Sequence, residues 1–255
     1  MSREGVMRPD SRLNNQMRRV KITRNVMKFA EGSALIEVGD TRVLSSATVE
    51  HRVPLFLKDR GEGWVTAEYA MLPRACAERV PRDVTRGRSA GRSSEIQRLI
   101  GRSLRAVVDR SFLGERTIVL DCDVLQADGG TRTASITGAF VALYDAVSRL
   151  KRDGLIEQWP VTSFCAGISA GIVRGEPLLD MCYGEDSMSD ADMNVVMADD
   201  GRFIEIQASG EDARFSKETF DRLLTMAAGA IQKLIELQKR VLGVGEARVE
   251  AAHSE

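Results

Sequence analysis

A strand pattern gives way to a helix pattern between residues 117 and 150, and this stretch carries the clearest signal in the chain. Residues 117–125 alternate apolar with polar positions, as a half-buried β-strand does. Further along, apolar residues recur at three- and four-residue spacing and predict one face of a helix: Ile136, Phe140, Leu143, Val147 and Leu150. Residues 128–133 lie between the two and contain a pair of glycines. The pattern therefore predicts a strand, a tight turn and a helix in succession.

Similar patterns precede this stretch. Alternation predicts a strand near residues 20–26, a hairpin over 33–49 and a strand over 63–69. A helix is expected over 94–110, with a buried face formed by Ile96, Leu99, Ile100, Leu104 and Val107.

Two more hairpins and a long helix follow it. The hairpins span residues 161–183 and 193–207, and the helix spans 217–242 with Ser216 as its N-cap. Because sheet elements and helices recur in the same order in both halves, we expect one α+β domain with internal pseudo-symmetry over residues 1–242. Residues 243–255 are expected to form a polar tail.

Composition narrows the class of protein. Hydrophobic residues make up 43% of the 255 residues and charged residues 29%, which is typical of a globular protein in water. No apolar run reaches membrane-spanning length, and the first residues lack the apolar core of a secretion signal. The four cysteines lie far apart and form no CxxC pair, so we expect reduced thiols and a cytoplasmic protein. With only two histidines, a Ser-His-Asp triad or a histidine metal site is not expected.

The glycine turn is a candidate anion site. A helix that starts directly after it presents backbone N–H groups and the positive end of its dipole. Nearby side chains add candidate donors: Thr131, Arg132, Thr133 and Ser135. The turn has neither the lysine of a P-loop nor the three-glycine spacing of a dinucleotide site. An ordinary strand-to-helix turn capped by Thr or Ser stays open as the alternative.

Arginines are concentrated in two segments. Residues 73–92 contain six of them and almost no large apolar residue, which predicts a long flexible loop that binds phosphate groups, with a solvated surface loop as the alternative. An anion site is also conceivable at Arg92 and Ser93, where the next helix begins. The arginines within residues 1–25 are expected to belong to a solvated tail that leads into the first strand.

Four carboxylates crowd the loop over residues 184–194: Glu185, Asp186, Asp190 and Asp192. Like charges at this density repel unless a cation lies among them, and Mg²⁺ accepts one or two carboxylates together with phosphate oxygens. An acidic solvent loop is the alternative.

Together these features favour phosphoryl transfer on a polyanionic substrate. A hydrolase must activate water with a base or a metal, whereas inorganic phosphate is already an anionic nucleophile at neutral pH. A cationic cradle that brings two anions together is then the main requirement.

Several runs of residues resemble the bacterial ribonuclease PH family of phosphate-dependent 3′-to-5′ exoribonucleases. The runs are Thr66–Arg74, Glu95–Ile100, Leu120–Ala134 and Asp192–Val196, and the resemblance covers nearly all of residues 8–240. It implies a β-α-β fold of the ribonuclease PH type, with mixed sheets packed against helices. It also implies a homo-oligomer, a hexameric ring of dimers, that trims the 3′ ends of transfer-RNA precursors and other structured RNA in a reversible reaction.

The same resemblance implies roles for individual residues. Inorganic phosphate, the co-substrate, is expected at Arg92, Gly130, Thr131 and Arg132. Catalysis and a bound Mg²⁺, with Mn²⁺ as a substitute, are expected at Asp186 and Asp192. RNA is expected to be guided by Arg74, Arg79 and Arg82.

The chain departs from the family pattern at Ser11, Cys76, Ala77, Ala208 and Ser209, which bears on loop geometry and RNA contacts more than on the chemistry. A catalytically inactive RNA-binding subunit of an exosome-like ring is the alternative function. It predicts loss of the phosphate arginines or of the aspartate pair, and all of these residues are present.

Overall fold

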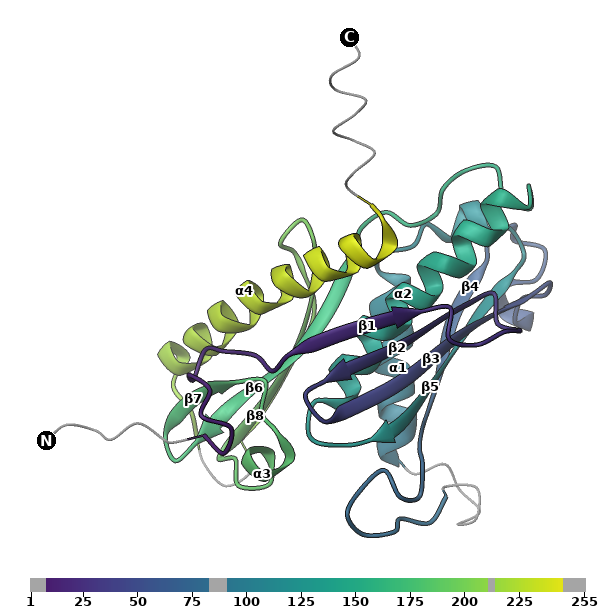
Figure 1. The fold of residues 1–255 in the computed structure, drawn as a ribbon. Coiled ribbons are helices and arrows are strands. Elements are labelled where there is room, and N and C mark those ends of the chain that lie inside the picture. Colours follow the sequence, from purple (N-terminus) through teal and green to yellow (C-terminus); the bar gives the residue numbers. More distant parts are fainter. Residues whose placement is uncertain (1–7, 83–90, 211–213, 245–255) are drawn as a thin grey trace, which may run out of the picture.

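Two β-sheets pack around a central helix in the computed structural model, which describes residues 8–82, 91–210 and 214–244 (Figure 1). The first sheet has the order β1-β2-β3-β5-β4 and contains β1 (Val20–Arg24), β2 (Gly32–Val38), β3 (Thr41–Glu50), β4 (Trp64–Met71) and β5 (Thr117–Gln126). Its neighbours are antiparallel except β4 and β5, which run parallel because α1 (Gly91–Arg105) lies between them in the chain.

The second sheet is antiparallel throughout and has the order β7-β6-β8-β9. Its strands are β6 (Cys165–Val173), β7 (Glu176–Leu179), β8 (Ala191–Ala198) and β9 (Phe203–Gly210). A short helix, α3 (Tyr183–Asp186), connects β7 to β8, and α4 (Lys217–Leu242) lies along this sheet (Figure 1). The α+β class is confirmed. The extent of a single domain over residues 1–242 stays a prediction, and residues 245–255 lie outside the described part.

The central helix is α2 (Thr131–Arg152), which packs against both sheets. Apolar residues outside the predicted face, such as Val141 and Ala142, are as fully buried as Phe140. A helix covered on several sides needs apolar or small residues almost all around its axis. More of α2 is therefore buried than the single apolar face read from the sequence predicted. Gly138 allows β2 to approach, because a Cβ atom there would lie 2.8 Å from Ile36 Cγ2.

Most predicted elements match the structure within a few residues, and two boundaries were wrong. The helix expected over 94–110 begins at Gly91 and ends at Arg105. Val107 and Val108 continue its apolar pattern and are buried, but Val107 lies in the turn that ends the helix and Val108 pairs with Val161. The first arm of the hairpin over 161–183 continues past Ala170 to Val173, so a single strand was divided at the wrong place.

The arginines of the N-terminal segment do not form a solvated tail in the described part. Arg8 and Arg18 are 2% and 6% exposed, and both are held in ion pairs with acids of the second half. Arg24 donates to the buried Asp145 on α2. Arg3 lies outside the described residues. Sequence spacing gave no sign of these pairs, because their partners lie more than 100 positions away.

Among the described residues, no helix combines the length and the apolar character needed to cross a membrane. Cys122 and Cys165 are buried free thiols, as expected, whereas Cys182 is only partly buried. Burial raises the pKa of the Cys122 thiol to about 12.

One ion pair joins α1 to the edge strand of the second sheet. The Nε and Nη2 atoms of Arg102 donate to the two carboxylate oxygens of Glu205 at 2.7 Å each. The hydrogen bond from Arg102 lowers the pKa of Glu205 below its ordinary value of 4.5. The resulting stabilisation is complete above pH 4.5 and is lost as the pH falls through the lowered pKa.

Glu205→Gln is therefore expected to lower the free energy of unfolding at pH 7 by about 1 kcal/mol, since the pair is partly exposed to solvent. Urea unfolding at pH 7 and at low pH measures this, and the difference between variant and wild type should shrink in acid. An equal difference at both pH values would contradict the assignment.

Candidate active site

A pocket of about 660 Å³ opens where the two halves of the protein meet. The first half contributes the turn between β5 and α2 and the start of α1, and the second half contributes α3 and the beginning of β8. Six predicted site residues lie in its wall: Arg92, Gly130, Thr131, Arg132, Asp186 and Asp192. These residues come from segments up to 100 positions apart, so folding brings together what the sequence only suggested.

The glycine turn has the geometry expected of an anion site. Gly129 and Gly130 have φ angles of 73° and 68°, a left-handed conformation that glycine adopts without strain. Gly130 is the N-cap of α2, and a glycine has no side chain with which to cap the first N–H groups. These donors and the helix dipole therefore face the pocket at Thr131 and Arg132.

Two of the predicted donors do not serve the pocket. Thr133 Oγ1 donates to the Gly130 carbonyl at 3.0 Å, and Ser135 Oγ donates to the Thr131 carbonyl at 2.8 Å. Both hydroxyls are thus taken up by the helix backbone, which is common for Ser and Thr inside helices. Thr131 behaves differently, because it lines the pocket and its hydroxyl forms a 3.0 Å hydrogen bond with the buried Tyr69 hydroxyl.

The two pocket arginines lie on different elements. Arg92 is exposed in the first turn of α1, and Arg132 is in the first turn of α2. The Arg132 guanidinium lies 3.4 Å from Gln207 Oε1 and 3.8 Å from a Glu95 oxygen, contacts that orient it loosely. Burial raises the pKa of Tyr69, and the Thr131 hydrogen bond and the positive charges of Arg92 and Arg132 partly oppose this rise. The charges of Arg92 and Arg132 thus both act on the surroundings of the Tyr69 hydroxyl.

The four crowded carboxylates divide into two pairs with different surroundings. Glu185 is 3% exposed and accepts hydrogen bonds from Arg8 at 2.7 and 2.8 Å. Asp190 accepts the Gly175 N–H at 3.1 Å. Only Asp186 and Asp192 lie in the pocket wall. The crowding is therefore relieved partly by a buried arginine, which the sequence did not reveal.

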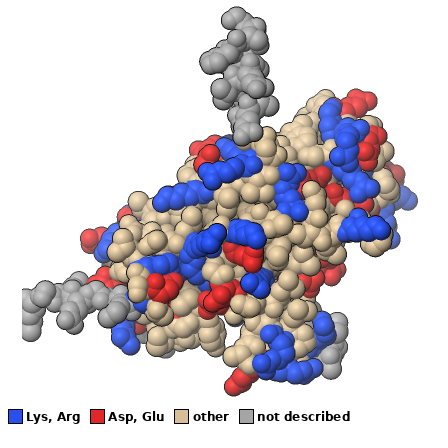
Figure 2. All heavy atoms as spheres, in the orientation of Figure 1, with Lys and Arg blue, Asp and Glu red and all other residues tan. Residues whose placement is uncertain are grey.

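The predicted RNA-guiding arginines lie outside this wall, within the part of the chain that the structure describes. Arg74, Arg79 and Arg82 are exposed on the loop after β4, whose inner side contributes Cys76, Glu78 and other residues to the pocket. Lys and Arg side chains gather on this projecting loop in the space-filling view (Figure 2). Its residues 83–90, with Arg86 and Arg88, lie outside the described residues, so the predicted flexibility there stays a prediction.

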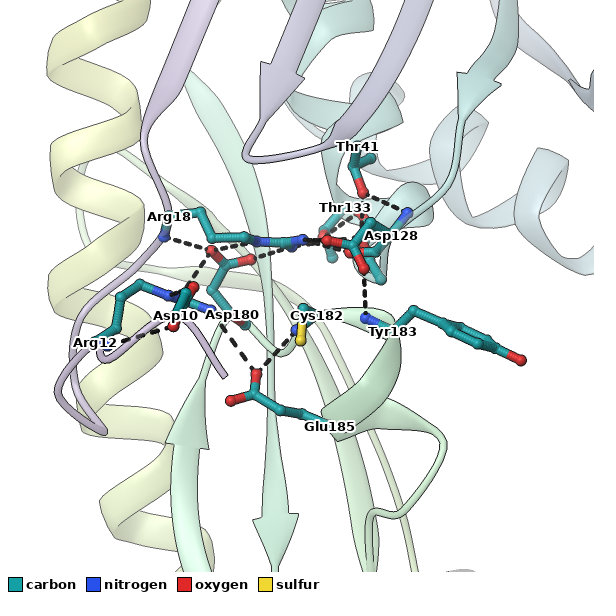
Figure 3. Close-up of polar contacts among 12 residues, drawn as sticks. Asp10, Arg12, Arg18, Thr41, Asp128, Thr133, Asp180, Cys182, Tyr183 and Glu185 are labelled. Atoms are coloured by element: carbon teal, nitrogen blue, oxygen red, sulfur yellow. Dashed lines mark hydrogen bonds and ion pairs between the residues drawn. The ribbon is translucent and has the colours of Figure 1, made fainter. Parts of the chain in front are cut away.

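Sequence reasoning missed three further residues in the pocket wall. Tyr183 is 65% exposed and directs its ring away from the polar network around it (Figure 3). Ser169 and Asn194 face each other across β6 and β8 and are both buried. They lie in or beside strongly apolar runs of sequence, and only the register of two strands places them together.

The departures from the family pattern fit the backbone. Ser11 has a φ of 61°, so it occupies the left-handed region in place of the usual glycine. Ala208 lies in the extended strand β9, where alanine is unstrained. Cys76 and Ala77 line the pocket at the loop.

The donor set suits Mg²⁺ better than a metal held by protein alone. Within the described residues, no group of three or more Asp, Glu, His or Cys side chains is arranged to hold a metal ion. Mg²⁺ commonly takes only one or two carboxylates and completes its octahedron with water and substrate phosphate. Asp186 and Asp192, which line one pocket with the glycine turn, match that requirement.

Comparison with known proteins identifies the family to which the chain belongs. Residues 16–148 match the family model of the 3′ exoribonuclease family, domain 1, and residues 163–230 match domain 2 of the same family. A ribonuclease PH from Syntrophomonas wolfei is 57% identical over 237 residues, which cover 93% of this chain and 99% of that protein.

Solved structures show the same fold. A chain of the Archaeoglobus fulgidus exosome, with RNA bound to the active site, superposes with a TM-score of 0.78 and 27% identity, covering 91% of this chain and 92% of that chain. Rice Rrp46 superposes with a TM-score of 0.73 at 19% identity, covering 91% and 98%. The likeness to the rice protein concerns the fold alone.

Proposed function

We propose a role for each pocket residue in the reaction of this chain, which belongs to the 3′ exoribonuclease family and is a phosphate-dependent 3′-to-5′ exoribonuclease. An oxygen of inorganic phosphate attacks the phosphorus of the last linkage, and the bond from that phosphorus to the 3′ oxygen breaks. The products are a nucleoside diphosphate and an RNA one nucleotide shorter. The reverse reaction adds a nucleotide.

Inorganic phosphate is bound by the glycine turn and the two pocket arginines. The N–H groups at the start of α2, the Thr131 hydroxyl and Arg132 contact it from one side, and Arg92 contacts it from α1. Two unit charges at 4 Å repel by about 4 kcal/mol near a protein surface. Fixed cationic donors offset this repulsion when the attacking anion meets the RNA phosphate.

Asp186 and Asp192 form the catalytic pair. They would hold Mg²⁺, or Mn²⁺ in its place, and the bound cation would supply positive charge against the negative charge that develops on the leaving 3′ oxygen. The single observation that supports this assignment best is the pocket itself, whose wall includes both acids and the glycine turn, whereas the neighbouring Glu185 is paired with Arg8.

The exposed arginines of the loop after β4 guide RNA toward the pocket. Arg74, Arg79 and Arg82 carry no structural ion pair among the contacts of the described residues, and arginine suits bidentate contact with phosphate.

Arg79→Ala is expected to weaken RNA binding about threefold to tenfold and to reduce the slope of log affinity against log salt by about 0.7. Phosphate KM should not change. Fluorescence anisotropy with a labelled single-stranded RNA at several salt concentrations measures both quantities. Arg202→Ala is the matched control, since Arg202 is 84% exposed in the turn at the opposite end of β8. An effect of equal size in both variants would contradict the proposed RNA path.

The substrate is the 3′ extension of transfer-RNA precursors, and the assembly is a hexameric ring of dimers in the cytoplasm. The identity to a ribonuclease PH over nearly the whole chain supports this proposal. An inactive ring subunit is not favoured, because the arginines and the aspartate pair all reach one pocket.

Trimming of a transfer-RNA precursor with a short 3′ trailer tests the substrate. With phosphate and Mg²⁺, the trailer should shorten one nucleotide at a time and the reaction should stop near the mature end. Rapid degradation through the folded body of the RNA would contradict it.

A further inference from the structure

The glycine turn before α2 (residues 128–130, here called the phosphate turn) contacts the backbone of the residues that lead into α3, the short helix that ends at Asp186. A Cβ atom on Gly129 would lie 2.3 Å from the Met181 carbonyl oxygen and 2.9 Å from the Cys182 carbonyl carbon. The turn belongs to the first half of the protein, and Met181 and Cys182 lead into α3 of the second half. The distance between the glycine turn and Asp186 therefore depends on this contact.

Asp128 bridges the same junction with its side chain. Its Oδ1 atom accepts the backbone N–H of Tyr183, the first residue of α3, at 3.0 Å (Figure 3). Asp128 itself directly precedes the two glycines of the turn. One carboxylate thus links the segment that carries the phosphate donors to the helix that ends at Asp186.

Other groups hold Asp128 in place. The Thr41 hydroxyl accepts the Asp128 N–H at 2.9 Å and donates to the Gly129 carbonyl at 2.7 Å. The Arg18 guanidinium donates to the Asp128 carbonyl and pairs with the buried Asp180 at 2.6 Å (Figure 3). The turn is therefore fixed from the side opposite to α3.

Glu185 attaches α3 to a different part of the protein. Glu185 accepts from Arg8 and from the Cys182 N–H, so it fastens the helix to the N-terminal segment. Its contacts do not include the phosphate turn. Asp128 couples α3 to the turn directly, through the hydrogen bond that it accepts from the Tyr183 N–H.

We propose that Asp128 is a positioning residue, whose carboxylate holds α3, and through it Asp186, in register with the phosphate turn. This inference rests on the proposed function of the pocket. Asp128 also lines the pocket, but its Oδ1 atom accepts the Tyr183 N–H and its Oδ2 atom lies 3.5 Å from Arg18 Nη1. Misplacement of a reacting group by about 1 Å is enough to slow a reaction about a hundredfold. Loss of a single hydrogen bond at this junction is therefore expected to lower kcat.

Two substitutions at Asp128 separate positioning from charge. Asp128→Ala removes the acceptor for the Tyr183 N–H, and it should lower kcat at least about tenfold and raise the Mg²⁺ concentration for half-maximal rate. Asp128→Asn keeps an acceptor oxygen and should stay within about threefold of wild type on both measures. RNA affinity without phosphate should be unchanged in either variant. Asp221→Ala, on the exposed face of α4, is the control for loss of a carboxylate.

The outcomes are distinct. Wild-type kcat and Mg²⁺ dependence in Asp128→Ala would overturn the proposal. An Asn variant as slow as the Ala variant would also overturn it, since an acceptor for the Tyr183 N–H would then be present without restoring the rate, and the charge, which also pairs with Arg18, would be the property that matters. If Asp128→Ala does not fold, Thr41→Val removes the support of the turn at a buried site of nearly equal volume, and an unchanged kcat there would contradict the proposal. Failure of the wild type to release nucleoside diphosphate would instead refute the proposed function.

Discussion

Asp192→Asn is expected to reduce phosphorolysis about a thousandfold while the melting temperature stays close to that of the wild type. Asp192 lies on β8, an interior strand of the second sheet, between Gly171 of β6 and Ser209 of β9. This strand fixes the position of the carboxylate in the pocket wall. Asparagine keeps the size of the side chain but removes the charge that a cation requires.

Asp190→Asn is the matched control for this substitution. Asp190 belongs to the same acidic segment, but it accepts a backbone N–H from Gly175 outside the pocket wall. Its substitution should leave turnover within about threefold, because an amide oxygen still accepts that hydrogen bond. Single-turnover rates with saturating RNA and phosphate measure both variants. Near-normal turnover of Asp192→Asn would refute the catalytic role of the residue.

Arg92→Ala is expected to raise phosphate KM at least tenfold, with RNA binding largely retained. Arg92 is exposed in the first turn of α1 and lines the same pocket as Arg132. Removing one of two cations leaves the repulsion between the attacking phosphate and the RNA partly uncompensated, and a loss of 1.4 kcal/mol already corresponds to a factor of ten.

The control for this effect lies on the same helix. Arg98 is exposed on α1 and lies outside the described pocket wall, so Arg98→Ala should leave phosphate KM unchanged. Initial rates at varied phosphate concentrations and RNA anisotropy without phosphate separate the two contributions. A large loss of RNA affinity in Arg92→Ala, with phosphate KM unchanged, would count against the assignment.

Local periodicity was sufficient for most of the fold. The hairpin over residues 33–49 turns at Gly39 and Asp40 as expected, because the pattern of burial and the turn residues agree. Ser216 caps α4 through a hydrogen bond from the Thr219 N–H. Where periodicity failed, at Val107 and Val108, burial continued after the helix had ended.

The site could be predicted only where residue type and neighbouring sequence carried the information. Glycines directly before a helix and the concentration of arginines in residues 73–92 point to an anion from the sequence alone. Asp186 and Glu185 are adjacent acids that composition cannot distinguish. They differ because Arg8, far away in the chain, pairs with Glu185. Long-range ion pairs of this kind carry no local signal.

The orientation of side chains within α2 was equally hidden. Thr131 and Thr133 have the same chemistry and lie two positions apart, yet the Thr131 hydroxyl bonds the Tyr69 hydroxyl and the Thr133 hydroxyl bonds the helix backbone. The helical period separates them by about 200° around the axis. A sequence motif identifies the donors available to a ligand, and the fold selects among them.

Identification of the released nucleotides tests most directly whether the protein uses inorganic phosphate as the nucleophile. RNA with an unpaired 3′ tail is incubated with the protein and Mg²⁺, with and without inorganic phosphate, and the released nucleotides are separated by chromatography. We expect nucleoside diphosphates, released only when phosphate is present. Nucleoside monophosphates released without phosphate would contradict this expectation, because water would then be the nucleophile.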